Sequence, residues 1–397
     1  MHSMSSTSAF LQAYARFLPL LFIQLLIAYL GAKRWPRLRS FFYGLFALVF
    51  LYSFAGFPRF GGKMSRPGWM VFAMGLWTYT STIAFACYMA VEGIGWVIRF
   101  FSPSARAGSS TAATRSTDKT RRELITTAAY VAAAIPTGVL LYGCAIERER
   151  FRVEEVSIPF ANLPADLEGF RILQLSDVHR SAFLSQKDLT RVVDACRELK
   201  PDMIVHTGDF ISGKGDPLEA CIDELARLNN NEPAFGCLGN HEIYAEAENL
   251  ATLLAARRGI TVLRQATTQI RRGNVVINLA GVDYLRRISS GKYLTGREGL
   301  LLPGAFNVLL SHNPDVFRAS APLGFDLTLS GHTHGGQIRT EILHEDIDMA
   351  RFYTPYVSGL YRSGTRVCYV TRGIGSIGIP SRVGAPPEIT LMKFTKA

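Results

Sequence analysis

Five short apolar segments after residue 170 end abruptly in polar residues, and this repeated pattern restricts the possible folds more than any other feature of the chain. Two segments with helical spacing, residues 186–199 and 218–228, separate the first three of them. This alternation of strand, helix and strand predicts an α/β fold with a parallel sheet, in which the carboxyl ends of the strands supply side chains to one crevice. The polar endings are Ser176-Asp-Val-His179, Gly208-Asp-Phe210, Gly239-Asn-His-Glu242, Ser311-His312 and Gly331-His-Thr-His334.

Most of the histidines of the chain lie in these endings. Five of the eight are there, together with two aspartates and one asparagine. Side chains two residues apart on an extended segment point to the same face, so neighbouring members of one ending converge. The glycines let the backbone turn sharply and approach closely. A set of this size exceeds the needs of one metal ion and predicts two divalent ions that share one carboxylate. The residues are Asp177, His179, Asp209, Asn240, His241, His312, His332 and His334.

Each ending taken alone also fits an ordinary turn. An Asp-x-His after a strand is commonly a capped turn, Gly-Asp is a common turn pair, and Asn240 fits the cap of a following helix. Five such endings in one order are difficult to explain as turns. The metal interpretation therefore rests on their coincidence.

In order, these motifs resemble the five motifs of calcineurin-like metallophosphoesterases, and the resemblance covers about residues 166–397. The last motif and two late segments are similar to a subgroup of membrane-attached or exported bacterial members: Gly331-His-Thr-His-Gly-Gly-Gln337, Arg372-Gly-Ile-Gly375 and Pro386-Pro-Glu-Ile389. That subgroup includes an enzyme that cleaves UDP-2,3-diacylglucosamine on the way to lipid A. One departure is the second motif, Gly208-Asp-Phe-Ile-Ser212, which lacks the downstream acidic residue of many relatives.

The resemblance implies a two-sheet α/β/β/α sandwich with a dinuclear metal site and a role for each motif residue. It places Asp177, His179 and His334 on one ion and Asn240, His312 and His332 on the other, with Asp209 between them. It leaves His241 outside the ligands as the catalytic residue that protonates the leaving oxygen. Oxygen and imidazole ligands without thiolate favour Mn²⁺, Fe or Zn²⁺, and the resemblance favours Mn²⁺. No other cofactor is expected.

The first 150 residues have a different composition, with apolar runs at 17–30, 41–57, 69–98 and 124–145. About 20 apolar residues span a bilayer. The runs predict an all-α bundle of three transmembrane helices in residues 1–101, a flexible Ser/Thr/Ala/Gly-rich linker at 102–122, and a fourth, anchoring helix at 123–150. The phosphoesterase domain then occupies 151–397. A buried helical bundle is the alternative.

Charge follows the same division. Residues 1–150 hold 16 Lys and Arg against 5 Asp and Glu, whereas residues 151–397 hold 27 of each sign. The basic excess therefore gives no support for nucleic-acid binding. Basic residues at 33–39 and 99–122 predict a multi-pass protein of the plasma (inner) membrane whose catalytic domain lies outside the cytoplasm. Six widely spaced cysteines predict neither a disulfide framework nor a zinc finger.

These features predict a membrane-anchored metallophosphoesterase that hydrolyses a phosphoester or pyrophosphate bond. Its expected partners are the lipid bilayer and a phosphorylated, lipid-like substrate such as UDP-2,3-diacylglucosamine, and no protein partner is indicated. One alternative is an exported phosphodiesterase that acts on phospholipid or another phosphodiester. Another is a non-catalytic membrane sensor or scaffold, against which the intact ligand set argues.

Overall fold

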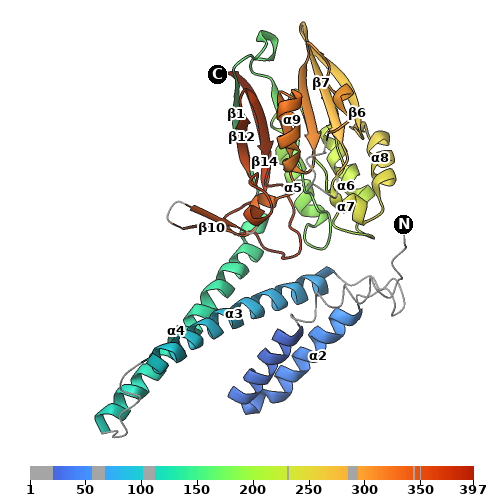
Figure 1. Cartoon of the computed structure of the whole chain (residues 1–397). Coiled ribbons are helices and arrows are strands. Elements are labelled where there is room, and N and C mark those ends of the chain that lie inside the picture. The colour runs from blue at the N-terminus through green and yellow to red at the C-terminus, as the bar shows by residue number, and fades with distance from the viewer. Residues whose placement is uncertain are drawn as a thin grey trace. The chain divides into compact units, whose positions relative to one another are not determined.

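The computed structural model describes residues 21–55, 68–101, 112–229, 232–284, 294–342, 345–348 and 350–397 (Figure 1). The chain divides into two units, Met1–Leu141 and Tyr142–Ala397, and each is described by itself.

The first unit is helical. Residues 21–34 form a helix, followed by the short helix η1 (Pro36–Leu38) and by α2 (Arg39–Ala55), α3 (Gly68–Phe101) and most of α4 (Ala112–Ala145). The first eleven residues of α4, 112–122, belong to the segment expected to be a linker. The rest of that segment, 102–111, lies outside the described residues, as do residues 17–20 and 56–57 of the expected spans.

Among the described residues, no helix has both the length and the apolar character that crossing a membrane requires. The predicted transmembrane bundle, its anchoring fourth helix and the multi-pass inner-membrane location were therefore wrong. Helix α2 has only 17 residues. The apolar sequence of α3 is interrupted by Thr78-Tyr-Thr-Ser-Thr82, where the Gln24 amide donates to Ser81 Oγ at 3.0 Å and to Thr82 Oγ1 at 3.1 Å. Helix α4 begins with a charged segment and continues with Ala and Thr.

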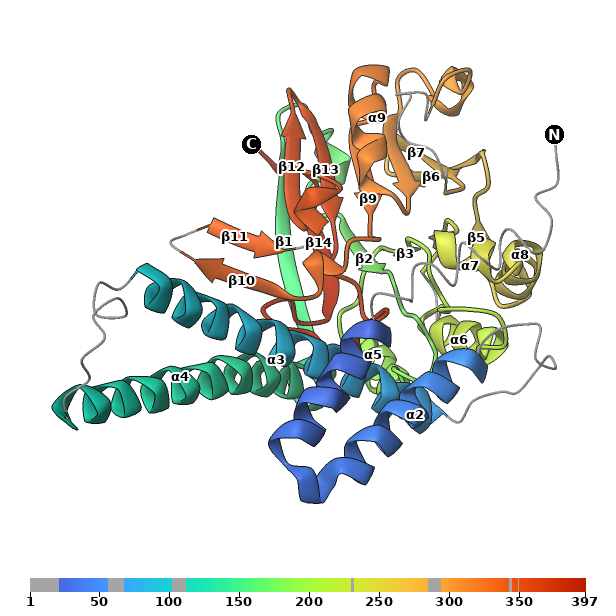
Figure 2. The ribbon, with the colours of Figure 1, turned by 60° about the horizontal axis from the view of Figure 1, so that its bottom comes forward.

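The second unit contains a six-stranded sheet with the order β1-β14-β2-β3-β4-β5. Strand β14 runs parallel to β1 and antiparallel to β2, and β2 to β5 are parallel (Figure 2). Helices α5 (Gln186–Arg197), α6 (Leu218–Leu225) and α8 (Glu248–Arg257) cover one face. The strands are β1 (Arg152–Phe160), β2 (Arg171–Leu175), β3 (Met203–His206), β4 (Ala234–Gly236), β5 (Ile260–Val262) and β14 (Glu388–Lys396).

A second six-stranded sheet has the order β12-β13-β9-β8-β7-β6. Its four inner strands are parallel, and the two edge strands are antiparallel to their neighbours. Helix α9 (Phe317–Leu323) packs on its outer face, and β10 (Arg339–Ile342) pairs with β11 (Glu345–Asp348) in a separate ribbon. The strands are β6 (Ala266–Arg272), β7 (Val275–Val282), β8 (Phe306–Ser311), β9 (Leu327–Ser330), β12 (Gly359–Ser363) and β13 (Arg366–Val370).

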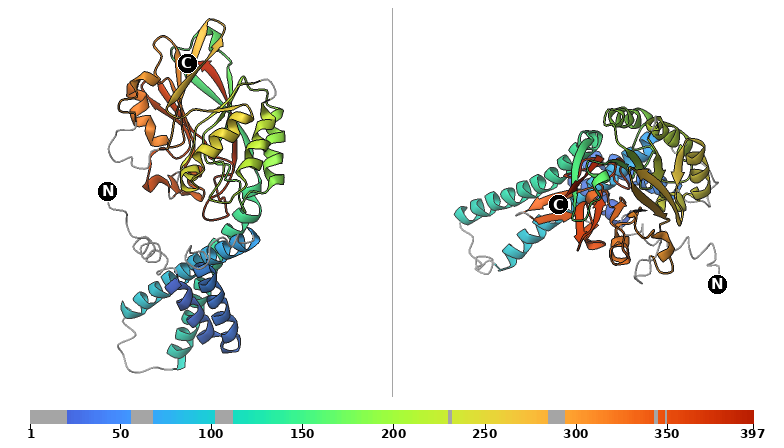
Figure 3. Two further views of the ribbon diagram at one scale, coloured as in Figure 1. Left: turned by 90° about the vertical axis from the view of Figure 1, so that its right-hand side faces the viewer. Right: turned by 90° about the horizontal axis from the view of Figure 1, so that it is seen from above.

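Side chains alternate between the two faces of each strand and so build two separate layers of core. On β3, Met203 and Val205 point into the space between the sheets, where they join Val308 and Leu327, whereas Ile204 points toward the helices. Helix α9 and helices α5 and α6 lie on opposite sides of the strands (Figure 3). The two-sheet α/β/β/α sandwich therefore agrees with the prediction.

Candidate metal centre

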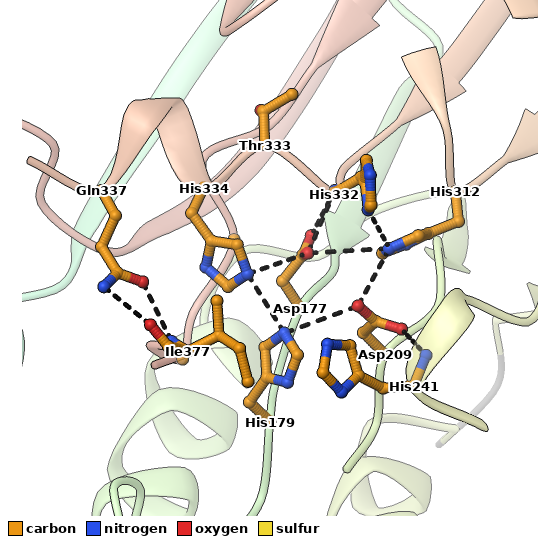
Figure 4. Close-up of polar contacts among 12 residues, drawn as sticks. Asp177, His179, Asp209, His241, His312, His332, Thr333, His334, Gln337 and Ile377 are labelled. Atoms are coloured by element: carbon orange, nitrogen blue, oxygen red, sulfur yellow. Dashed lines mark hydrogen bonds and ion pairs between the residues drawn. The ribbon is translucent and has the colours of Figure 1, made fainter. Parts of the chain in front are cut away.

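The predicted site residues lie on loops that follow five strands. Asp177 and His179 follow β2, Asp209 follows β3, and Asn240 opens the short helix α7 (Asn240–Tyr244) after β4. From the second sheet, His312 follows β8, and the loop after β9 carries the last two histidines. These endings meet at one place (Figure 4), because the inner strands of each sheet are parallel and present their carboxyl ends at one edge.

One group of possible ligands consists of Asp177, His179 and His334. The Nε2 atoms of His179 and His334 are 3.1 Å apart, and His334 Nε2 lies 3.4 Å from Asp177 Oδ1. All three residues are buried. Two ring nitrogens and a carboxylate oxygen that face one another in this way suit a divalent ion with mixed ligands.

A second group consists of Asp209, His312 and His332. His312 Nε2 lies 3.0 Å from Asp209 Oδ2 and 3.2 Å from His332 Nδ1. The same Asp209 Oδ2 is 3.5 Å from His179 Nε2 of the first group. One carboxylate oxygen therefore serves both groups.

The backbone supports a functional reading of these loops. Asp177, His179, Asp209, His332 and His334 have φ values of 51°, 47°, 56°, 75° and 54°. Side-chain-bearing residues rarely adopt this left-handed conformation, which costs on the order of 1–3 kcal/mol at each position and persists only where the surrounding structure imposes it. The loops are therefore held in a strained geometry that aims these side chains at one point.

Burial sets the protonation of the imidazoles. It lowers the pKa of His179 and of His332 to about 3, and burial followed by the charge of Arg382 lowers the pKa of His334 well below its usual value. Burial also acts on His312, but the Asp209 and Asp177 carboxylates more than offset it and raise the pKa of His312 to about 10. At neutral pH three of the four imidazoles are uncharged, the form in which histidine binds metal.

The two aspartates respond differently to burial. Burial raises the pKa of Asp177. Burial opposes ionisation of Asp209 as well, but His312 and His179 outweigh it, so the pKa of Asp209 lies well below its usual range. Asp209 is therefore a carboxylate at neutral pH. The buried Oδ1 atom of Asn240 has no hydrogen-bond partner in the described part of the chain, as expected for an oxygen reserved for a cation. The residues present fit divalent ions.

The structure places His241 beside the first group. Its ring centre is 4.7 Å from that of His179, and its Nδ1 lies 2.6 Å from the Ser212 carbonyl oxygen. The backbone N–H of His241 donates to Asp209 Oδ1 at 2.8 Å. His179, Asp209 and His241 also satisfy the geometry of a metal-binding group, so His241 borders the site at the distance of a ligand.

Several residues support the site through contacts that the sequence did not predict. Ser212 Oγ lies 3.2 Å from His179 Nδ1, and the Tyr284 ring lies 5.3 Å from that of His332. Glu242 is buried, and its carboxylate accepts from the backbone N–H groups of Asp209, Phe210 and Gly239 at 2.8–3.0 Å, although burial raises its pKa to about 7. Ser212 and Glu242 lie within motifs found in the sequence, but nothing in the sequence indicated these contacts.

Arg382 is a further residue of this kind. It is fully buried, and its guanidinium donates to the His334 carbonyl oxygen at 2.8 Å. It lies 48 positions after His334, and nothing in the surrounding sequence distinguishes it from a surface arginine.

Comparison with known proteins gives consistent matches. The family model described as calcineurin-like phosphoesterase matches residues 170–336. An uncharacterized metallophosphoesterase of Bacillus subtilis, YkuE, is 33% identical over 256 residues, which is 63% of this chain and 88% of that protein. The phosphodiesterase YaeI of Escherichia coli is 33% identical over 57% of this chain and 82% of its own length. A zebrafish protein named transmembrane protein with metallophosphoesterase domain is 32% identical over 67% of this chain, and the match spans 63% of that relative.

Proposed function

The chain belongs to the calcineurin-like metallophosphoesterase family, whose members hydrolyse phosphoester bonds, and we propose that it cleaves a phosphodiester or pyrophosphate bond with two divalent ions. The observation that carries this proposal is the position of Asp209 Oδ2, which lies 3.0 Å from His312 Nε2 and 3.5 Å from His179 Nε2. A carboxylate common to two groups of ligands is what a pair of ions needs.

We assign Asp177, His179 and His334 to one ion and Asn240, His312 and His332 to the other, with Asp209 common to both. When bound, the two ions would supply the positive charge that makes water a nucleophile at neutral pH and stabilises the phosphoryl oxygens. Mn²⁺ is our first choice of metal and Fe or Zn²⁺ the second, because the ligands combine carboxylate and imidazole without thiolate.

We assign His241 as the residue that donates a proton to the leaving oxygen. Its Nδ1 lies 2.6 Å from the Ser212 carbonyl oxygen, which can only accept, so Nδ1 carries a hydrogen in every protonation state. Nε2 is therefore the atom that gains or gives a proton. The fixed Ser212 contact orients the ring, and a proton on Nε2 is available only to the imidazolium form.

For the organic part of the substrate we propose a lipid-like group, with UDP-2,3-diacylglucosamine, and hence lipid A biosynthesis, as the first specific compound to test. Phe352 and Tyr353 support an apolar contact, because they are 79% and 81% exposed on and beside the short helix η9 (Ala350–Phe352). This helix packs against η8 (His334–Gly336), which carries a candidate ligand. Exposed aromatic side chains beside a polar centre suit a substrate with both phosphate and apolar parts.

Turnover assays on the purified chain test the proposal. The substrates are bis(p-nitrophenyl) phosphate, UDP-2,3-diacylglucosamine and a phosphatidylglycerol, each with and without added Mn²⁺. We expect metal-dependent hydrolysis of the generic diester that is lost in Asp209→Asn. Binding of Mn²⁺ without turnover of any of the three would contradict the proposal and favour a scaffold. Turnover of the generic diester alone would reject only the lipid-like substrate.

A further inference from the structure

The last turn of helix α4 lies directly against the chain segment 381–383. Gly143 accepts a hydrogen bond from the backbone N–H of Arg382 at 3.2 Å, within the unit that begins at Tyr142. A Cβ atom added to Gly143 would lie 2.4 Å from the Arg382 carbonyl oxygen, 2.5 Å from Ser381 Oγ and 2.6 Å from Val383 Cγ2. Real Cβ atoms do not approach backbone oxygens so closely, so this contact requires glycine.

The Arg382 side chain runs from this contact to the metal centre. Its guanidinium is fully buried and donates to the carbonyl oxygens of His334 at 2.8 Å and of Gly375 at 2.9 Å. It also lies 3.1 Å from His334 Nδ1, on the ring whose Nε2 faces His179. In the described part of the chain its other hydrogen bonds go to the backbone carbonyls of Arg372, Gly373 and Ala385.

A buried guanidinium that is held by carbonyl groups is expensive for a fold to maintain. Its desolvation is offset only when the donors find acceptors, and a carboxylate would offset it better. The planar fork of Arg382 instead fixes the His334 loop and the Gly375 loop at a set distance from each other. Positioning of His334 therefore accounts for an arginine that is buried here without a carboxylate partner.

The loop that Arg382 anchors also supports the other two residues of the first group. The Gly375 N–H donates to the Asp177 carbonyl oxygen at 2.7 Å, and a Cβ at Gly375 would lie 2.8 Å from His179 Cβ. Gln337 ties the same loop to the last motif, because its amide donates to the Ile377 carbonyl oxygen at 3.0 Å and accepts from the Ile377 N–H at 2.9 Å (Figure 4). The supports of one ion-binding group are thus gathered on one loop.

We propose that the last turn of α4 sets the geometry of the Asp177, His179 and His334 group through Arg382, which is a positioning residue. The inference rests on the assignment of metal ions under the proposed function. It adds that the two ions depend on different parts of the chain. A displacement at Gly143 lowers the affinity for the ion held by His334. The affinity for the ion held by His312 and His332 does not change.

Two glycine substitutions in the same helix test the proposal. Gly143→Ala introduces the steric conflict, and Gly138→Ala is the matched control, because a Cβ at Gly138 meets no atom within 4 Å in the described structure. Metal content is measured by mass spectrometry after Mn²⁺-loaded protein is dialysed against increasing chelator. We expect Gly143→Ala to release one ion at roughly 10-fold lower chelator concentration, the scale of a lost supporting contact. Gly138→Ala should match the wild type.

The identity of the released ion is established in two backgrounds. The first background is His332→Ala, which removes a ligand of the second ion. In this background Gly143→Ala should still weaken binding of the ion held by His334. Combined with His334→Ala, which removes a ligand of the first ion, it should leave the affinity of the ion held by His312 and His332 unchanged. Equal weakening of both ions, or no weakening of either, would overturn the proposal.

A measurement on the unaltered chain covers the case in which Gly143→Ala does not fold. Hydrogen exchange of the Arg382 amide, which donates to Gly143, is followed with and without Mn²⁺. Metal loading should slow this exchange several-fold, because metal binding and the Arg382–Gly143 contact are linked through His334. Unchanged exchange would contradict the linkage. Failure of Mn²⁺ to bind at all would instead reject the proposed function.

Discussion

His206 provides a quantitative test of how burial controls protonation in this fold. It lies on β3, where it alternates with Val205 and so shares the helix-facing side with Ile204. The side chain is 1% exposed, and neither ring nitrogen has a hydrogen-bond partner among the described residues. Burial lowers its pKa from 6.5 to about 4. We predict that His206→Leu stabilises the protein more at acid than at neutral pH.

The sign and size follow from proton linkage. Between about pH 6.5 and pH 4 the unfolded chain binds a proton at His206 that the folded chain does not, so the wild type loses stability as the pH falls. With these two pKa values the loss between about pH 8 and about pH 5 is roughly 2 kcal/mol. Leucine cannot titrate, so the stabilising effect of His206→Leu should increase by that amount.

Urea denaturation of wild type and variant at both pH values, with chelator present throughout, measures this difference. Other histidines also titrate, but they are common to both proteins and cancel in the comparison. Val205→Ala is the control, because it creates a cavity on the opposite face of the same strand and should cost the same at both pH values. If the effect of His206→Leu is equal at both pH values, burial does not lower the pKa of His206 and the reasoning fails.

Three further predictions concern the candidate centre. Asp209→Asn should weaken the binding of both ions by at least about 10-fold, because the shared ligand loses its charge. The metal content after dialysis measures this effect, and full retention of both ions would contradict the prediction. His241→Ala should keep both ions and lose about 10²- to 10⁴-fold in rate, mostly on substrates with poorly leaving alcohols; the rate measured against leaving-group pKa checks it, and loss of metal would make His241 a ligand. Gly331→Ala should destabilise the protein by about 1–3 kcal/mol in urea denaturation, because its Cβ would lie 2.1 Å from Ser176 Oγ and 2.2 Å from Asp177 Oδ2. Unchanged stability would show that these two side chains can move aside without cost.

The sequence was most informative where structure is determined locally. The ends of apolar segments indicated where strands stop, and parallel strands bring such ends to one edge whatever the distance between them in the chain. For this reason Asp177 and Asp209, which follow neighbouring strands of one sheet, could be expected at one place. The meeting of His312, from the second sheet, with these two residues followed only from the family resemblance. The two-sheet sandwich followed from the family resemblance of the same motifs.

Long-range contacts and the properties of whole helices were not predictable in this way. Arg382 and Gly143 acquire their roles only when distant segments meet, and neither has a distinguishing neighbour in the sequence. The transmembrane prediction was wrong, because no helix among the described residues has both the length and the apolar character that a membrane span requires.

The place of β14 in the first sheet has a consequence for how the protein is made. This strand occupies residues Glu388–Lys396, yet it lies between β1 and β2, which are synthesised roughly two hundred residues earlier. Until the ribosome has passed residue 396, β1 has no neighbour in this sheet and the inner edge of β2 stays open. An open strand edge is a template for pairing with other chains, and pairings so distant in sequence form slowly. The nascent protein therefore remains exposed to misassembly for most of its synthesis, and chaperone protection of β1 and β2 should matter more to its yield than the stability of the finished sheet.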